Sequence, residues 1–247
     1  MLKFISHTAK KWLRIVESWS MLEEANLIAS KDGLELRAMD PSRAAMVDFS
    51  LPAISFDTYE CKKGPHRLGL NIEEFTAIMK RISNNDTFTL ELTEPSKVEL
   101  SFLGSLEKIY GLALLDLGDE EFPAPEITTN ASITLLTKTF QGILKDAELV
   151  SDHLIIEANK LEFILKSSSE SKDFSTIIER HHDDIADFKV TNEHRALYNL
   201  SYLKEMTKPN INDLLKISFS DGMPIEFSYP VLLGGKLSYY CAPRTEV

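Results

Sequence analysis

Cysteine is scarce in this chain, which has two in 247 residues, Cys61 and Cys241. So few thiols exclude a disulfide-stapled scaffold and indicate an intracellular protein. No apolar run approaches the length of a membrane span, and no segment resembles a signal peptide. The sequence also lacks a Gly-rich phosphate loop, a nucleophile elbow and a paired CxxC motif, so the common signatures of nucleotide-binding, hydrolytic and redox enzymes are missing.

Positive charge is also in short supply. The chain has 27 Lys and Arg against 38 Asp and Glu, a formal net charge of −11. Taken alone, this balance favours a solvated acidic surface over a nucleic-acid partner, although net charge does not say where the charges lie. The apolar content of 43% is ordinary for a globular protein, and the length allows one domain or two.

One stretch, residues 34–52, combines two alternating runs with a rigid turn. Apolar and polar residues alternate over 34–39 and again over 45–50, as in half-buried strands. Asp40 and Pro41 between them favour a tight reversal, because proline fixes the backbone angle that the second turn position needs. The pattern predicts a hairpin. Met39 is an apolar residue on its polar face, and so indicates a surface that meets a partner.

The rest of the chain reads as helices and strands in alternation. Helical spacing of apolar residues predicts four helices, with Thr8, Asn71 and Thr137 as caps of the first three: residues 8–21, 71–81, 137–150 and 201–208. Alternating apolar runs predict further strands: residues 2–6, 25–30, 56–61, 87–92, 97–102, 108–115, 133–136, 153–158, 161–166, 174–179, 187–190, 214–219, 225–229 and 236–241.

Residues 116–130 break this pattern. The segment is acidic and carries Pro123 and Pro125, a spacing that neither a helix nor a central strand tolerates. It reads as an extended connecting loop in which Phe122 is the single bulky aromatic residue.

The two sides of this loop repeat each other. Three dipeptides recur at a constant shift of 127 positions: Leu27-Ile28 and Leu154-Ile155, Leu34-Glu35 and Leu161-Glu162, Asn85-Asp86 and Asn212-Asp213. One shift within the same order of elements indicates an internal duplication. We therefore expect an α+β fold of two similar domains, residues 1–115 and 131–247, each an antiparallel sheet with two helices on one face.

Over its whole length the chain resembles a known family, the archaeal-type DNA sliding clamps or proliferating cell nuclear antigen (PCNA). The resemblance is carried by residues 36–43, 56–61 and 237–244 together with the acidic, proline-bearing loop. It implies a closed ring of three subunits, with sheets outside and helices lining a hole around duplex DNA. Such a ring is a moving platform that gives polymerases processivity. It is not an enzyme and needs no cofactor.

The resemblance places basic residues of the four helices towards DNA. The helix faces opposite the apolar stripes carry Lys10, Lys11, Arg14, Lys80, Arg81, Lys138, Lys145, Lys204 and Lys208. Contacts of this kind go to phosphates, so we expect binding to double-stranded DNA without sequence preference and with strong salt dependence. For any single lysine, a merely solvated position is about as probable.

The resemblance also implies a front-face pocket and a subunit interface. Short PCNA-interacting peptides of DNA polymerase, flap nuclease and DNA ligase would enter the pocket, and a clamp loader would open the ring. The pocket would be walled by Met39, Ala44, Met46, Phe122, Ala124, Pro224, Tyr240, Ala242 and Pro243. The interface would pair two edge strands through Lys108, Tyr110, Leu112, Leu114, Phe174, Thr176, Ile178 and Arg180.

Three alternatives stay open at this point. The ring could be a homotrimer or a heterotrimer of paralogues, or a checkpoint-type clamp of the same fold. An enzyme is the competing class, since His181 and Asp183 would share a strand face and could touch a metal. Neighbouring ligands in a loop are weak evidence, and no second ligand cluster is present. The expected location is intracellular: the cytoplasm and nucleoid in an archaeon, the nucleus in a eukaryote.

Overall fold

The structure is a computed structural model that describes residues 1–119, 122–123, 125 and 127–244. The chain divides into two compact units. The first unit comprises Met1–Arg43, Val47–Pro123 and Pro230–Leu237, and the second comprises Ala44–Met46, Ala124–Tyr229 and Ser238–Val247. Each unit thus includes a short segment from the other half of the chain: Pro230–Leu237 in the first unit and Ala44–Met46 in the second. The sequence-based boundaries at residues 115 and 131 stay a prediction.

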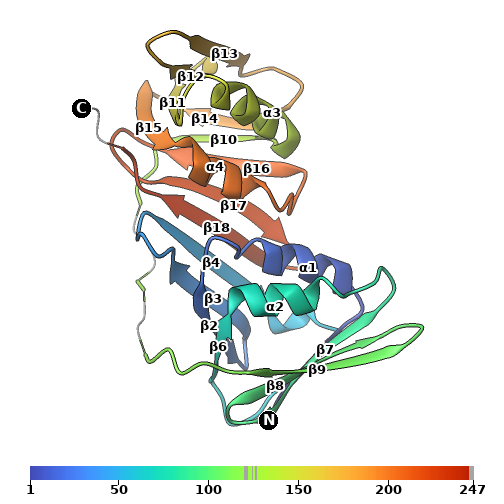
Figure 1. Ribbon diagram of the computed structural model, residues 1–247. Helices are drawn as coiled ribbons and strands as arrows, with labels where there is room; N and C mark the ends of the chain where they lie inside the picture. Colours follow the sequence, from blue (N-terminus) through green and yellow to red (C-terminus); the bar gives the residue numbers. More distant parts are fainter. Residues whose placement is uncertain (120–121, 124, 126, 245–247) are drawn as a thin grey trace. The chain divides into compact units, whose positions relative to one another are not determined.

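Eleven helices and strands follow one another in the first half of the chain, and the second half repeats their order (Figure 1). The first half contains β1 (Leu2–Ser6), α1 (Ala9–Glu17), β2 (Glu24–Ser30), β3 (Gly33–Met39), β4 (Ala45–Pro52), β5 (Thr58–Cys61), β6 (His66–Asn71), α2 (Ile72–Met79), β7 (Thr87–Glu94), β8 (Lys97–Leu103) and β9 (Glu107–Ala113). The second half contains β10 (Ala131–Leu136), α3 (Thr137–Glu148), β11 (His153–Ala158), β12 (Glu162–Ser168), β13 (Asp173–Glu179), β14 (Ile185–Val190), β15 (His194–Asn199), α4 (Leu200–Thr207), β16 (Leu214–Phe219), β17 (Ile225–Val231) and β18 (Gly235–Cys241).

The strand order also repeats between the two halves. In the first half the strands run β5-β1-β7-β8-β9 and β4-β3-β2-β6, and in the second half β14-β10-β16-β17-β18 and β13-β12-β11-β15. The pairings β1–β7, β2–β3, β10–β16 and β11–β12 are all antiparallel. Strands β9 and β13 each end their sheet, so one side of each has no partner strand in the described part of the chain.

Aromatic side chains fill the core of the first unit between its helices and strands. The rings of Phe4 and Trp12 stack with centroids 5.4 Å apart, which fixes α1 on β1. Trp19, just after α1, meets Phe49 of β4 at 5.3 Å and Phe75 of α2 at 6.3 Å. The predicted apolar stripe of the first helix is therefore buried, as its spacing indicated.

The second unit has a smaller aromatic core. Phe140 of α3 meets Phe227 of β17 edge to face at 5.4 Å, and Tyr229 meets Tyr239 at 6.3 Å. The Oη of Tyr229 donates a hydrogen bond to the carbonyl oxygen of Met206 in α4 at 3.2 Å. In each unit the pair of helices packs on strands through one apolar face, and the opposite face stays exposed (Figure 1).

Two strands and two caps differ from the sequence-based expectations. Strands β6 and β15 were not predicted, although each leads directly into a helix. Thr8 stands at the N-cap position but its side chain makes no capping bond, and Thr137 is the first residue of α3 rather than its cap. The side chain of Asn71 does cap α2, by accepting a hydrogen bond from the N–H of Glu74 at 2.9 Å.

The described residues of 116–130 lie outside helices and strands, as their prolines predicted. In the described part of the chain, no helix combines the length and the apolar character that crossing a membrane requires.

Candidate functional site

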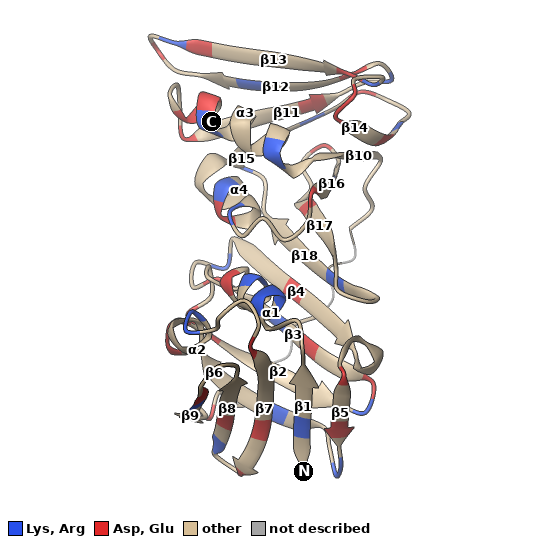
Figure 2. Cartoon of the chain, turned by 90° about the vertical axis from the view of Figure 1, so that its right-hand side faces the viewer, with Lys and Arg blue, Asp and Glu red and all other residues tan. Residues whose placement is uncertain are grey.

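Basic side chains occupy the exposed face of α1. Lys10, Lys11 and Arg14 are exposed, whereas Trp12 and Ile15 between them are buried. Figure 2 shows the blue of Lys and Arg along α1. The ammonium groups of Lys10 and Lys11 make no hydrogen bond or ion pair with the described residues. Unpaired lysines on a helix face are free to meet an anion such as a phosphate.

Lys80 and Arg81 extend this basic character in the first unit. Both follow the last residue of α2 and both are exposed. Cations at this position also interact favourably with the negative end of the helix dipole. Lys80 and Arg81 can therefore stabilise the C-terminal end of α2 and can also bind an external anion.

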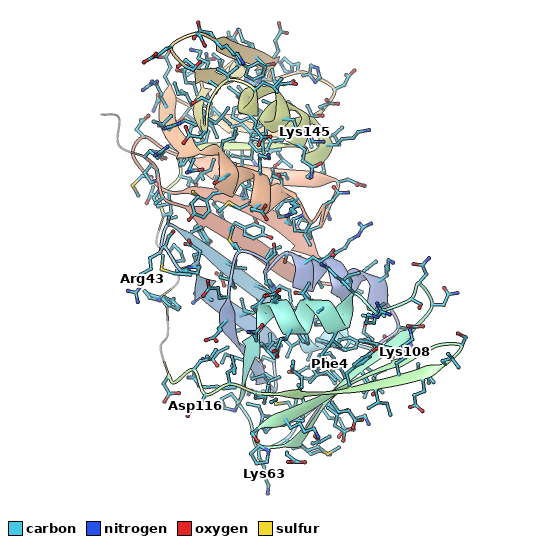
Figure 3. All side chains as sticks on the ribbon, viewed as in Figure 1. Phe4, Arg43, Lys63, Lys108, Asp116 and Lys145 are labelled. Carbon is cyan, nitrogen blue, oxygen red and sulfur yellow. The ribbon has the colours of Figure 1, made fainter. Side chains whose placement is uncertain are left out.

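The basic residues of the second unit are of two kinds. Lys138 and Lys145 are exposed on α3, where Lys145 extends outward (Figure 3). Lys204 of α4 instead forms an ion pair with Glu148, and the ammonium of Lys208 lies 3.2 Å from a carboxylate oxygen of Glu205. The charges of Lys204 and Lys208 are thus compensated within the unit, so α3 contributes more free positive charge than α4.

Strand β9 presents an apolar edge. Leu112 is buried and Tyr110 packs its ring 5.7 Å from Phe102, while Ile109 on the other face is 57% exposed. The ammonium of Lys108 donates to the carbonyl oxygen of Arg81 at 3.1 Å, and so joins this edge to the end of α2. The predicted interface residue Leu114 lies just beyond the strand.

Strand β13 has the same pattern in the second unit. Phe174 and Thr176 are half-buried and Ile178 is buried, but Ile177 on the opposite face is 56% exposed. Arg180 follows the strand, with its guanidinium 5.9 Å from the centre of the Phe188 ring. The sequence-based set thus lies on the inner faces of both edge strands. It omits Ile109 and Ile177, whose exposure the alternation alone could have indicated.

The connecting loop is fastened to the outer face of the β4-β3-β2-β6 strands in the first unit. Asn26 Nδ2 donates to the Gly118 carbonyl oxygen at 3.2 Å, and Arg67 Nε lies 3.3 Å from Asp119 Oδ1. Arg37 of β3 also contacts the loop, at the carbonyl oxygen of Phe122, and forms an ion pair with Asp48 of β4. Gly118 and Asp119 are therefore held at a defined position along the sheet.

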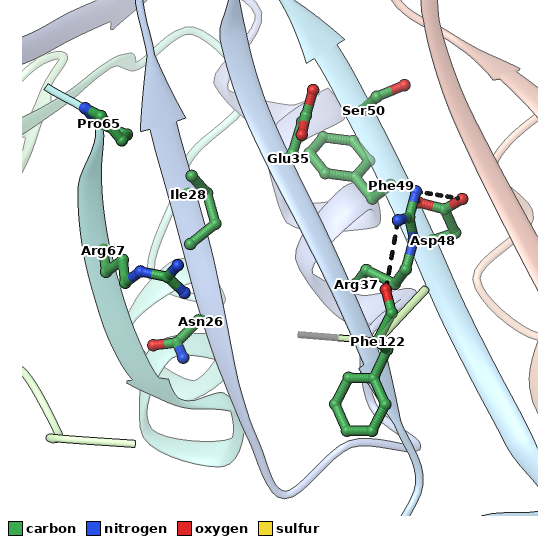
Figure 4. Close-up of a pocket in the computed structure, with 10 residues that line it drawn as sticks. All are labelled: Asn26, Ile28, Glu35, Arg37, Asp48, Phe49, Ser50, Pro65, Arg67 and Phe122. Carbon is green, nitrogen blue, oxygen red and sulfur yellow. Dashed lines mark hydrogen bonds and ion pairs between the residues drawn. The ribbon is translucent and has the colours of Figure 1, made fainter. Parts of the chain in front are cut away.

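Arg37 of β3 makes two contacts that order this surface (Figure 4). Its guanidinium donates to the carbonyl oxygen of Phe122 at 3.4 Å and forms an ion pair with Asp48 at 3.2 Å. A pocket of about 520 Å³ lies between the loop and the strands, with Phe122 and Pro65 on its rim. Met39 is half-buried two residues farther along β3.

The hairpin turn after Met39 is built as the sequence predicted. The Asp40 carboxylate accepts hydrogen bonds from the N–H of Ser42 at 3.1 Å and from its hydroxyl at 2.5 Å. The Arg43 N–H donates to the Asp40 carbonyl oxygen at 2.9 Å, which closes the turn. Arg43 has a φ of 58°.

The remaining described residues of the expected pocket belong to the second unit. The Ala242 N–H donates to the Ala44 carbonyl oxygen at 2.9 Å, a bond within the second unit. Tyr240 Oη lies 3.2 Å from a Glu226 carboxylate oxygen, and the side chain of Met46 is buried. The second unit also contains Pro224 and Pro243, both half-buried, whereas Ala124 lies outside the described residues.

The chain end is fixed by one further residue. The Arg244 N–H donates to the Leu197 carbonyl oxygen at 2.8 Å, and its guanidinium contacts Nε2 of His153 and the Asp152 carboxylate. The residues that precede Arg244 are thereby held as an extended segment of defined position.

His181 and Asp183 lie in the turn between β13 and β14. Both are exposed, and in this turn the Nδ1 of His182 accepts a hydrogen bond from the Asp184 N–H at 3.1 Å. Over the described residues no group of three or more His, Cys, Asp and Glu side chains could hold a metal ion. The shared strand face on which the metal hypothesis depended does not exist, because these residues form a turn.

Comparison with known proteins gives one consistent family. Residues 2–117 match the family model for the N-terminal domain of proliferating cell nuclear antigen. The DNA polymerase sliding clamp of Thermococcus onnurineus is 32% identical over 233 residues, which cover 94% of this chain and 93% of that protein. The sliding clamp of Pyrococcus furiosus is 30% identical over 240 residues, 96% of each chain.

Solved structures show the same fold. PCNA from Thermococcus kodakaraensis superposes with a TM-score of 0.94 at 22% identity, over 99% of this chain and 100% of that one. A PCNA2–PCNA3 complex from Sulfolobus tokodaii gives a TM-score of 0.90 at 23% identity, with the same coverage. Because the sequence relationship spans nearly the whole of both chains, this chain belongs to the family of DNA polymerase sliding clamps.

Proposed function

We propose that three copies of this subunit, or this subunit with two paralogues, close into a ring that encircles duplex DNA. The observation that carries this proposal is that β9 in one unit and β13 in the other, two of the six described strands that end a sheet, each expose an isoleucine. Two different edges on one chain suit a head-to-tail contact, which closes into a ring when the rotation between subunits fits. The exposed Ile109 and Ile177 on these edges would lose contact with water on pairing.

The basic helix faces would meet the DNA inside such a ring. Lys10 and Lys11 of α1 and Lys138 and Lys145 of α3 carry unpaired charges, which support contacts to phosphates. Phosphate contacts alone give no sequence preference, and they exchange rapidly enough for the ring to slide. The acidic excess of the chain would then belong to surfaces away from the DNA.

Partner enzymes would bind on the outside through short peptides. Met39 and Phe122 of the first unit offer apolar contacts for an aromatic anchor, and Tyr240 and Ala242 of the second unit offer contacts of their own. The backbone at Phe122 in the first unit, and separately the backbone at Ala242 in the second, would offer main-chain pairing to a peptide. DNA polymerase, flap nuclease and DNA ligase are the proposed clients, and a clamp loader would open the ring.

This role requires no reaction on the protein itself. We therefore include in the proposal that the subunit is not an enzyme, and that it works inside the cell where the DNA is.

The mass of the assembly tests the ring. We expect the purified protein, alone or mixed with its paralogues, to sediment as a species of three chains of 27.9 kDa each. Ile177→Lys should break this species, because it places a charge at the edge of β13. Leu149→Lys is the matched control, since Leu149 is 71% exposed in the same unit but off the edge. A monomer under all these conditions would contradict the proposal.

A further inference from the structure

Two exposed aliphatic side chains lie at the end of β3 and β4 that is remote from the Asp40–Arg43 turn. Ile54, in the short 3-10 turn after β4, is 77% exposed, and Leu233, between β17 and β18, is 70% exposed. Both belong to the first unit. The Ser55 hydroxyl donates a hydrogen bond to the Leu233 carbonyl oxygen and so ties the two turns together. We call Ile54, Leu233 and the cavity beside them the Leu233 patch.

The turn that carries Leu233 has a sequence that turn geometry does not explain. Leu232 has a φ of 44°, in the left-handed region that Gly, Asn and Asp occupy more readily than leucine. Leu233 adds an apolar side chain that the fold leaves in water. The two leucines cost backbone strain and exposed apolar surface, and the fold of the turn gains nothing from the exposed one.

The cavity of the patch has a volume of about 190 Å³ and lies beside Pro52 and Gly234. It is smaller than the ~300 Å³ at which pockets begin to hold small-molecule ligands, so it suits one side chain of a partner. The charged groups among its lining residues are two carboxylates, those of Asp32 and Glu35. Neither carboxylate makes a hydrogen bond or ion pair with any described residue.

The larger pocket along the same strands differs in this respect. There Arg37 forms an ion pair with Asp48 (Figure 4), and Arg67 forms one with Asp119. Glu35 lines both cavities, and its carboxylate takes part in neither of these two ion pairs. The carboxylates of Asp32 and Glu35 therefore lie at the cavity whose lining includes Pro52 and Gly234, near the turns of Ile54 and Leu233, and the exposed Lys31 precedes Asp32 in the chain.

The acidic side of the patch is held rigidly. The Tyr59 Oη lies 2.7 Å from the carbonyl oxygen of Ser30 and 2.8 Å from that of Gly33, on either side of Asp32, and its one proton is shared between them. Burial raises the pKa of Tyr59, so the hydroxyl stays protonated and remains a donor. The Ala53 N–H donates to the Asp32 carbonyl oxygen at 2.9 Å, which joins this turn to the one that carries Ile54. A surface ordered in advance loses little entropy on binding.

We propose that the Leu233 patch docks a segment of a partner protein that presents an aliphatic side chain next to a lysine or arginine. The aliphatic group packs against Ile54 and Leu233, and the cation enters the cavity between Asp32 and Glu35. Charge complementarity selects this partner over an acidic one. The patch lies at the opposite end of β3 from Met39, so it is separate from the peptide surface proposed above and does not depend on it.

The test uses the full-length protein with labelled Ile and Leu methyl groups and two synthetic peptides. The first peptide is Gly-Leu-Arg-Leu-Lys-Gly, and the second is its charge-reversed counterpart Gly-Leu-Glu-Leu-Glu-Gly. We expect the basic peptide alone to shift the methyl signals of Ile54 and Leu233. Leu233→Asn, and separately Asp32→Asn with Glu35→Gln, should each weaken binding at least ten-fold.

Matched variants distinguish this site from general attraction to an acidic protein. Leu149→Asn removes an equally exposed leucine, and Glu170→Gln with Glu193→Gln removes two exposed charges elsewhere. These variants should bind the basic peptide as the unchanged protein does. Equal loss in the controls, equal binding of the acidic peptide, or no shift at the patch would overturn the proposal. It would also fall if Leu233→Asn abolished a concentration-dependent pairing of assemblies, because the occupant would then be a second copy.

Discussion

Single residues of this chain fix the positions at which strands and turns meet. Gly33 has a φ of 141°, and a Cβ built there would lie 2.1 Å from the Leu51 carbonyl oxygen. Any other residue must move the β2–β3 turn away from the end of β4. The backbone of residues 51–53 lies too close to Gly33 for any Cβ, so every other residue type meets the same clash.

Gly33→Ala should destabilise the protein by about 2 kcal/mol or more, because it combines backbone strain with a clash against main-chain atoms. Gly142→Ala is the matched control. Gly142 lies inside α3, and nothing lies within 4 Å of an added Cβ. It should stabilise the protein by about 0.5–1 kcal/mol through helix propensity. Urea denaturation measures both, and equal effects of the two changes would contradict this reading.

A second residue-scale prediction concerns the turn before β17. The Arg195 N–H donates to the Asp221 carboxylate at 2.6 Å, and Nδ1 of His194 lies 3.0 Å from it. The Arg195 N–H and, to a smaller extent, His194 hold the pKa of Asp221 below its ordinary value, although partial burial acts the other way. A lowered pKa means that Asp221 stabilises the fold fully above about pH 4 and loses this effect as the pH falls further.

Asp221→Asn should therefore lower the free energy of unfolding at neutral pH, and the difference from the unchanged protein should shrink below about pH 4. Urea denaturation from pH 2.5 to pH 7 measures this difference. Asp183→Asn, in an exposed turn, is the control. A difference that grows on acidification would show that the sign is wrong.

At the scale of elements, side chains of the sheet hold the connecting loop in place by hydrogen bonds and an ion pair. Asn26 binds Gly118, Arg67 binds Asp119 and Arg37 binds Phe122. Replacing Asn26 and Arg67 by alanine removes two bonds of about 0.5–1.5 kcal/mol each. Amide hydrogen exchange at residues 115–119 should then accelerate about ten-fold or more.

The control for this prediction is Lys62→Ala, which removes the exposed ion pair with Glu60 in the same unit. Exchange in the loop should not respond to it, and global stability should change little in either variant. If amide hydrogen exchange in the loop stayed at its original rate without the side chains of Asn26 and Arg67, other contacts would have to hold the loop, and this prediction would be wrong.

Much of the element order could be predicted from the sequence, because the apolar periods of long elements are clear. Strands β6 and β15 were missed although they are as long as several predicted strands, and β6 contains Gly69, a residue depleted in strands. The structure explains this glycine: a Cβ would lie 2.1 Å from the Leu115 carbonyl oxygen, where the connecting loop leaves the sheet. His66-Arg67 and His194-Arg195 open these two strands at a shift of 194 − 66 = 128, a repeat that could have identified both.

The site could be predicted less completely than the fold. The alternation of residues 34–39 predicted that Met39 lies on the outer face, and the prolines of 116–130 predicted a loop. Each prediction needed only the local sequence of one segment. The pairing of Lys204 with Glu148 and the contact of Arg37 with Phe122 join residues 56 and 85 positions apart. Contacts across such separations depend on how strands align, which local patterns do not encode.

At the scale of the whole molecule, we propose that this acidic chain holds DNA through the exposed lysines on its helix faces. Lys10→Ala and Lys11→Ala should each lower the slope of log affinity against log salt by about one if each contacts a phosphate. Lys62→Ala, off the helices, should leave the slope unchanged. Fluorescence anisotropy with a short duplex at several salt concentrations measures the slopes. An equal change in all three variants would assign the effect to net charge instead.

The central claim is that the assembled subunits hold DNA by surrounding it. The most direct measurement is retention of the protein on a circular plasmid, after loading with a clamp loader and ATP, before and after a single enzymatic cut makes the DNA linear. We predict retention on the circle at high salt and rapid loss from the linear molecule, because a closed ring slides off a free end. Equal retention on circular and linear DNA would contradict the account.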